Sequence, residues 1–72
     1  MTPIQCKMAR VAVGLGVREL AEVAKVAPST VTRFEGGGGV HVRTIDAMRA
    51  ALESAGVEFT NDDQPGVRLA KG

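Results

Sequence analysis

The chain has 72 residues and a net formal charge of +1, and 44% of its residues are hydrophobic. A chain of this length forms one small domain that buries about 60% of its unfolded surface. The ordinary apolar content argues against disorder throughout. Phe34 and Phe59 are the only aromatic residues, so the core must consist of aliphatic residues, alanine and methionine.

The cysteine content and the hydropathy indicate where such a protein would work. Its single cysteine, Cys6, can form no internal disulfide, which favours a reducing, cytoplasmic setting. The longest uncharged stretch near the N-terminus, residues 11–17, is far too short to span a membrane. The sequence therefore predicts a soluble cytoplasmic protein with no membrane partner.

Residue patterns typical of catalysis are not evident. The chain shows no Ser, His and Asp set, no paired acidic cleft and no cofactor-binding loop. His41 is the only histidine, and no cysteine or carboxylate stands at metal-ligand spacing from it. We expect a protein that binds rather than catalyses, without a cofactor or a metal.

The charges are distributed unevenly along the chain. Residues 1–49 contain seven Lys or Arg and four Asp or Glu, for a net charge of +3. Residues 50–72 contain two basic and four acidic residues, for a net charge of −2. This pattern suggests a basic working end and an acidic tail end, although two solvated faces could also differ by chance.

The first predicted helix begins with a capping box. Thr2 is the expected N-cap, Pro3 occupies the first helical position, and Gln5 stands three residues after the cap. We expect Cys6 to be a small core residue on this helix. Apolar residues at helical spacing predict its buried stripe as Ile4, Met8, Val11, Ala12 and Leu15.

Two short helices joined by a tight turn follow. The first is expected over residues 17–24, with Leu20, Ala21 and Ala24 facing inward, and the turn covers residues 25–27. The second is expected over residues 28–35. Its inward residues are Val31 and Phe34, which leaves Ser29, Thr32 and Arg33 on the outer face.

Residues 36–39 are four glycines, which predict a flexible link. A fourth helix is expected next, with Thr44 as its N-cap, Asp46 in its first turn and Gly56 just beyond its end. Its predicted apolar stripe consists of Ile45, Met48, Leu52 and Ala55.

The last residues change to a period of two, which predicts a β-hairpin. Val57 and Phe59 alternate with polar residues, residues 61–66 form the expected turn, and Val67 and Leu69 alternate with Arg68. We therefore expect a helical unit over residues 1–56 and a hairpin extension over residues 57–72. The hairpin could cap the core through Phe59 and Leu69, or one of its strands could pair with a second chain and build a twofold dimer.

The helical pair over residues 17–35 has the layout of a helix-turn-helix, whose second helix lies in the DNA major groove. On the outer face of residues 28–35, Arg33 can contact guanine, and Ser29 and Thr32 can contact bases or phosphates. The expected contacts to the DNA backbone are Arg18, Lys25, Thr30, His41 and Arg43.

Residues 10–52 resemble the Cro/C1-type helix-turn-helix domain of phage repressors and XRE-like bacterial regulators. The matching residues are Leu15, Glu19-Leu20-Ala21, Ala24, Val26, Thr30-Val31, Phe34-Glu35-Gly36 and Leu52. The resemblance implies a mainly α, four-helix, lambda-repressor-like domain that reads DNA as a homodimer. It also implies that Arg10 pairs with Glu35.

Four features depart from the family pattern. Lys25 stands where the family usually has glycine, Ala27 replaces the usual Ser or Thr cap, Gly16-Val17 replaces a common Ser-Gln, and the loop after residues 28–35 is stretched into four glycines. Such departures favour an alternative, namely a protein-interaction module on the same fold, such as an antitoxin-like or anti-activator partner. For a DNA-binding regulator, repression by blocking RNA polymerase is the simplest mechanism, and Glu19 and Glu22 could contact the polymerase in an activator.

Overall fold

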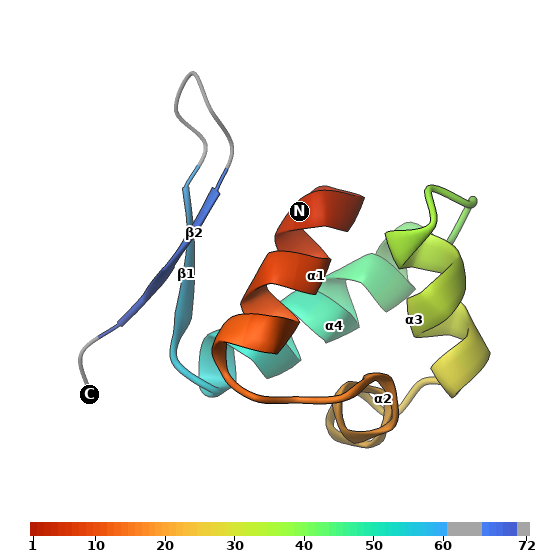
Figure 1. The fold of residues 1–72 in the computed structure, drawn as a ribbon. Coiled ribbons are helices and arrows are strands. Elements are labelled where there is room, and N and C mark those ends of the chain that lie inside the picture. The colour runs from red at the N-terminus through yellow and green to blue at the C-terminus, as the bar shows by residue number, and fades with distance from the viewer. Residues whose placement is uncertain (61–65, 71–72) are drawn as a thin grey trace.

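The computed structural model describes residues 1–60 and 66–70 and shows a mainly α-helical fold (Figure 1). Within these residues the chain forms helices α1 (Pro3–Ala12), α2 (Val17–Ala24), α3 (Pro28–Glu35) and α4 (Val42–Ser54). Strands β1 (Val57–Thr60) and β2 (Gly66–Leu69) then form an antiparallel hairpin. The predicted four helices and hairpin are confirmed, while residues 61–65 of the predicted turn lie outside the described residues. None of the helices described is long and apolar enough to cross a membrane.

Helix α1 begins with the predicted capping box. The backbone N–H of Gln5 donates to Thr2 Oγ1 at 3.1 Å, and the N–H of Thr2 donates to Gln5 Oε1 at 2.8 Å. The Gln5 side chain is buried, and its Nε2 also donates to the carbonyl oxygens of Thr60 and Gly66 at 3.0 Å each. One glutamine thus both caps α1 and fastens the hairpin to it.

The predicted buried stripe of α1 is wrong. Cys6 and Ala9 are fully buried with Gln5, whereas Ile4 and Val11 are 68% and 62% exposed. Met8 and Ala12 are exposed as well, and Leu15 is half-buried beyond the end of the helix. Two faces of α1 carry apolar residues at helical spacing, and the one with the smaller side chains packs against the core.

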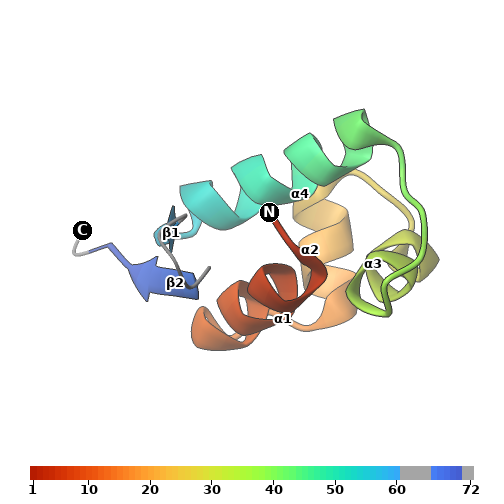
Figure 2. The same cartoon turned by 90° about the horizontal axis from the view of Figure 1, so that it is seen from above.

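Helices α2 and α3 have the predicted bounds and the predicted inward faces. Their fully or nearly buried residues join Met48, Ala51, Leu52 and Val57 in one core. The residues that α2 and α3 contribute to it are Leu20, Ala21, Ala24, Val31 and Phe34. Seen from above, α1, α2 and α3 lie to one side of α4 (Figure 2), and in both views the hairpin lies beyond the C-terminal end of α4 (Figures 1 and 2).

Three helices end in the same hydrogen-bonding pattern, in which a left-handed residue reverses the chain. At the ends of these three helices, the residues with positive φ are Gly14 after α1 (φ 73°), Lys25 after α2 (φ 60°) and Gly37 after α3 (φ 88°). In each case this residue and the next donate their N–H groups back into the last turn of the helix. This is the Schellman motif, which normally uses glycine because a Cβ atom disfavours positive φ.

Helix α4 begins three residues earlier than predicted. Its N-cap is His41, whose Nδ1 accepts a hydrogen bond from the N–H of Arg43 at 3.1 Å, so Thr44 lies inside the helix. Consequently Asp46 lies beyond the first turn. A neutral imidazole can accept this bond, although histidine is not among the usual N-cap residues. Met48 and Leu52 are buried as expected, Ile45 is half-buried and Ala55 is exposed.

The hairpin packs one face on the helices. Cross-strand pairing places Val57 opposite Leu69 and Phe59 opposite Val67 on that face. Val57 is buried and Phe59 is half-buried, with the Arg49 guanidinium 5.5 Å from the centre of its ring. The expected capping of the core is thus confirmed for Phe59 but not for Leu69, which is 54% exposed.

Candidate nucleic-acid interface

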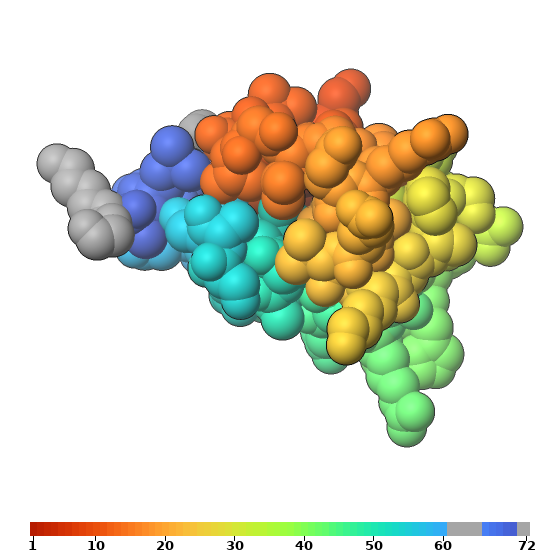
Figure 3. All heavy atoms as spheres, turned by 90° about the horizontal axis from the view of Figure 1, so that it is seen from below, coloured from red at the N-terminus to blue at the C-terminus, as the bar shows by residue number. Residues whose placement is uncertain are grey.

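The candidate interface is built on α2 and α3, which pack against each other at the end of the molecule opposite the hairpin (Figures 1 and 3). In Figure 1, α2 is seen end-on while α3 runs across the view, so the two helices cross at a large angle. Lys25 makes the sharp turn between them, because Lys25 N–H donates to Glu22 O and Val26 N–H donates to Ala21 O. The local backbone therefore fixes how α3 leaves α2.

A bidentate ion pair holds the C-terminal end of α3 against α1. Arg10 Nε and Nη2 lie 2.9 and 3.0 Å from the two carboxylate oxygens of Glu35. Arg10 Nη1 also donates to Leu15 O at 3.1 Å, in the segment that joins α1 to α2. The hydrogen bond to Glu35 raises the pKa of Arg10. This confirms the Arg10–Glu35 pairing, and it links three segments that position α3.

The buried thiol of Cys6 lies beside this pair. Cys6 Sγ donates to Glu35 Oε2 at 3.5 Å. Burial, together with the neighbouring Glu35 charge, raises the pKa of Cys6 from 9.0 to about 12. The prediction that Cys6 is a small core residue is confirmed, and its thiol also supports the carboxylate.

The three residues predicted to contact bases share the exposed side of α3. Ser29, Thr32 and Arg33 are all exposed, while Val31 and Phe34 point into the core. Thr32 Oγ1 donates to Pro28 O at 3.3 Å, so this hydroxyl proton is used within the helix and its oxygen is left as an acceptor. The structure thus brings the predicted base-contacting residues together on one surface.

The glycine segment after α3 has a defined role beside Arg33. Gly37 N–H donates to Phe34 O at 3.0 Å, and Gly38 N–H donates to Arg33 O at 2.8 Å. A Cβ atom at Gly38 would lie 2.6 Å from Arg33 Cγ and 3.1 Å from Arg33 O, whereas one at Gly39 would meet nothing within 4 Å. The first part of the expected flexible link therefore forms the hydrogen-bonded end of α3. The aliphatic part of the Arg33 side chain lies against Gly38.

The residues predicted to contact phosphates fall into two groups. Arg18 in the first turn of α2 and Lys25 in the turn are exposed, and Thr30 is half-buried near the start of α3. His41 and Arg43 instead lie at the start of α4, beyond the other end of α3, where His41 uses Nδ1 as the helix cap. The structure does not bring all five side chains into one cluster.

Glu19 and Glu22, the two α2 carboxylates predicted as a possible polymerase contact, also line this surface. A shallow groove of about 490 Å³ is lined by Arg18, Glu19, Ala21, Glu22, Val26 and Pro28, which places both glutamates beside Arg18. The spacing of four residues between Arg18 and Glu22 makes these two side chains neighbours on the surface of α2. The groove between α2 and α3 is therefore of mixed charge rather than uniformly basic.

The described part of the chain contains no group of three His, Cys, Asp or Glu side chains that could hold a metal ion. No protein-family model matches the chain, and no curated protein matches it.

Proposed function

We propose that the protein is a sequence-specific DNA-binding transcriptional regulator of the Cro/C1-like helix-turn-helix type, which reads the major groove with α3. The observation that carries the proposal is the arrangement of α3. Its exposed side presents Ser29, Thr32 and Arg33, and its inner side is fixed by Val31, Phe34 and the Arg10–Glu35 pair. A short, rigidly held helix with small polar and guanidinium groups suits readout of base edges.

In this role Arg33 would donate two hydrogen bonds to O6 and N7 of a guanine, which contribute about 1–3 kcal/mol of discrimination. Ser29 and Thr32 would contact neighbouring bases or phosphates. Arg18 and Lys25 would bind the phosphates that flank α3, and Thr30 would approach the backbone. His41 and Arg43 would bind a more distant phosphate. A homodimer would bind two half-sites about 34 Å apart on successive major grooves, and repression would follow from blocking RNA polymerase.

Salt dependence tests DNA binding without knowledge of a target sequence. The affinity of the wild-type chain for a labelled random-sequence duplex should fall steeply between about 50 and 200 mM salt, because phosphate contacts release counterions. Arg18→Ala should lower the slope of log affinity against log salt by about 0.9. Arg49→Ala removes a guanidinium near the hairpin and should leave the slope unchanged. A wild-type chain with no measurable affinity at low salt would contradict the proposal.

The alternative is a protein-interaction module, and the mixed charge of the α2–α3 groove favours it. Glu19 and Glu22 lie beside Arg18 and next to the apolar surface of Ala21, Val26 and Pro28. Carboxylates repel phosphates but suit a protein partner with basic groups. Binding of such a partner through an apolar interface would change little over the same range of salt, which separates the two functions.

A further inference from the structure

We infer that the outer face of α1 and the free edge of β2 together form the surface through which two copies of this chain associate. The inference rests on the homodimer of the proposed function for the identity of the partner, but it does not require DNA binding. It starts from two features that the fold leaves unpartnered, and both features lie on the same side of the molecule.

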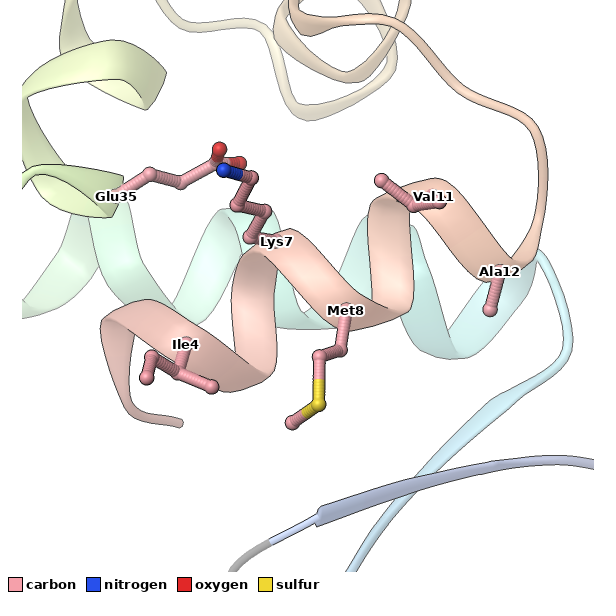
Figure 4. Close-up of a pocket in the computed structure, with 6 residues that line it drawn as sticks. All are labelled: Ile4, Lys7, Met8, Val11, Ala12 and Glu35. Carbon is pink, nitrogen blue, oxygen red and sulfur yellow. The ribbon is translucent and has the colours of Figure 1, made fainter.

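The first feature is the outer stripe of α1, which consists of Ile4, Met8 and Ala12. These side chains stand one turn apart and point to the side of α1 along which β2 runs (Figure 4). Ile4 is 68% exposed and Met8 is 38% exposed, although the smaller Cys6 and Ala9 are fully buried on the opposite side. The stripe borders an open depression of about 660 Å³ that Lys7, Val11 and Glu35 also line.

Among the apolar residues of α1, the large side chains thus face outward while the small ones face inward. Burial of a Leu- or Ile-sized side chain contributes about 1.5–3 kcal/mol, so a lone domain would gain more from the opposite arrangement. Contiguous exposed apolar patches often mark interaction sites.

The second feature is the outer edge of β2. Ala70 N–H donates to Gly56 O at 2.6 Å, and hydrogen-bonded pairs alternate along an antiparallel ladder. The N–H and C=O groups of Val67 and Leu69 therefore point away from β1. No other described residue donates to these groups or accepts from them. Leu69 is 54% exposed on the hairpin face that packs against the helices.

A second copy supplies what both features lack. The unpaired edge of a strand offers its N–H and C=O groups to another chain, and the edge of β2 can pair antiparallel with the same edge of a copy about a twofold axis. The two hairpins would then form a four-stranded sheet, whereas an isolated two-stranded hairpin is barely stable in water.

In the same twofold arrangement, the second copy would cover the outer stripe of α1. Because Gln5 fastens β2 to α1, the position of α1 on the sheet face is fixed. The two α1 helices would lie side by side over the sheet, with Leu69 beneath them. Stable interfaces bury about 800 Å² per partner, which the few side chains of the outer stripe cannot reach without the adjoining β2.

The arrangement leaves the candidate DNA surface open. Helix α3 lies at the end of the molecule opposite the hairpin (Figures 1 and 2). One copy measures 29 Å along its longest axis, so two copies joined at their hairpin ends could reach two half-sites about 34 Å apart.

Sedimentation equilibrium of the full chain without DNA tests the inference. At concentrations on the order of 100 μM, the wild-type chain should have twice its monomer mass of 7.5 kDa. Met8→Glu, which hardly changes helix propensity, should weaken association at least about tenfold. Leu69→Pro should do the same, because proline removes an outward N–H without removing a hairpin hydrogen bond. Val23→Glu places the same charge on an equally apolar, 56% exposed position of α2 and should leave the dimer intact.

Amide exchange of the wild-type chain provides a second readout that needs no variant. The N–H groups of Val67 and Leu69 should become protected as the protein concentration rises through the association range. A wild-type monomer, unchanged association of Met8→Glu or Leu69→Pro, or rapid exchange of both amides in the dimer would overturn the inference. A monomer that still selects a DNA sequence would overturn this inference alone, and a dimer that binds no DNA would overturn the proposed function alone.

Discussion

Lys25 occupies a left-handed backbone conformation, with φ 60° and ψ 45°, and is the only described residue other than glycine with positive φ. A Cβ atom makes this conformation costly by about 1–2 kcal/mol. A lysine stands here although glycine would avoid this cost, which is consistent with a task for its positive charge beside the start of α3. Substitutions at Lys25 can separate the cost of the left-handed conformation from the effect of the positive charge.

We predict that Lys25→Gly raises the free energy of unfolding by about 1 kcal/mol, as measured by urea denaturation. Lys25→Ala is the matched control, because it removes the same side chain and keeps the Cβ atom, so it should give little stabilisation. Both variants should lose the same amount of DNA affinity if Lys25 binds a phosphate. Equal stability of the two variants would contradict the assigned strain.

The Arg10–Glu35 pair is a second residue-scale feature, with side chains only 13% and 10% exposed. We expect Glu35→Gln to lower the free energy of unfolding by about 2–4 kcal/mol, because it leaves a nearly buried guanidinium without its counter-charge. Glu53→Gln breaks the exposed Arg49–Glu53 pair and should cost less than about 0.5 kcal/mol. Similar losses in both variants would show that the Arg10–Glu35 pair has no special structural role.

The Cys6 thiol gives a pH dependence with a definite sign. Its pKa is about 12 in the folded protein against 9.0 for a free thiol, so the folded state holds this proton more tightly than the unfolded state. Its contribution to stability is therefore complete below about pH 9 and is lost as the pH rises toward 12. In thermal melts, wild type should lose more stability than Cys6→Ala between pH 8 and pH 10. Parallel curves would contradict this role of the thiol.

At the scale of elements, the four glycines after α3 divide into a structural part and an open part. The hydrogen bonds of Gly37 and Gly38 end the helix, and the stem of Arg33 lies against Gly38. No hydrogen bond of the described chain is recorded for the Gly39 backbone, and a Cβ atom there would meet open space.

We expect Gly38→Ala to displace the side chain of Arg33 and to weaken DNA binding about tenfold, a loss of about 1.4 kcal/mol. Gly39→Ala adds the same methyl group one residue later and should bind DNA like wild type. Fluorescence anisotropy with one labelled duplex measures both variants, and circular dichroism confirms that each remains helical. Equal affinities for Gly38→Ala and wild type would show that Gly38 does not position Arg33.

The elements also show which parts of the fold the sequence could predict. The bounds of α2 and α3 follow from their apolar spacing and from Pro28, which suits a first helical position. The face of α1 was missed because residues 5, 6 and 9 and residues 4, 8 and 12 both fit a helical period, and burial depends on how closely α3 and α4 approach. The start of α4 was missed because a histidine cap uses a ring nitrogen rather than a typical capping oxygen.

The candidate site was predictable in part for a similar reason. Periodicity showed that Ser29, Thr32 and Arg33 share an outer face, since this requires only one helix. The grouping of Glu19 and Glu22 with Val26 and Pro28 depends on how α2 packs on α3, which no single-helix pattern contains. The contact between Arg33 and Gly38 likewise depends on the backbone path of the glycine segment.

At the scale of the whole molecule, the two proposed surfaces lie at different ends. The side of α3 proposed to read bases lies at one end and the hairpin lies at the other, with α1 between them (Figure 1). A protein of 72 residues gains stability from association. Dimerisation would both stabilise the fold and place two α3 helices on the two half-sites of one DNA target.

The most direct test of the account is selection of bound fragments from a pool of random duplexes at about 0.15 M salt, with wild type and Arg33→Ala in parallel. We predict that wild type enriches a sequence with two related half-sites. Arg33→Ala should relax the preference at one base position in each half, because it removes the contact to guanine. Failure of the wild-type chain to enrich any sequence would contradict the account and would favour a protein partner for the α2–α3 surface.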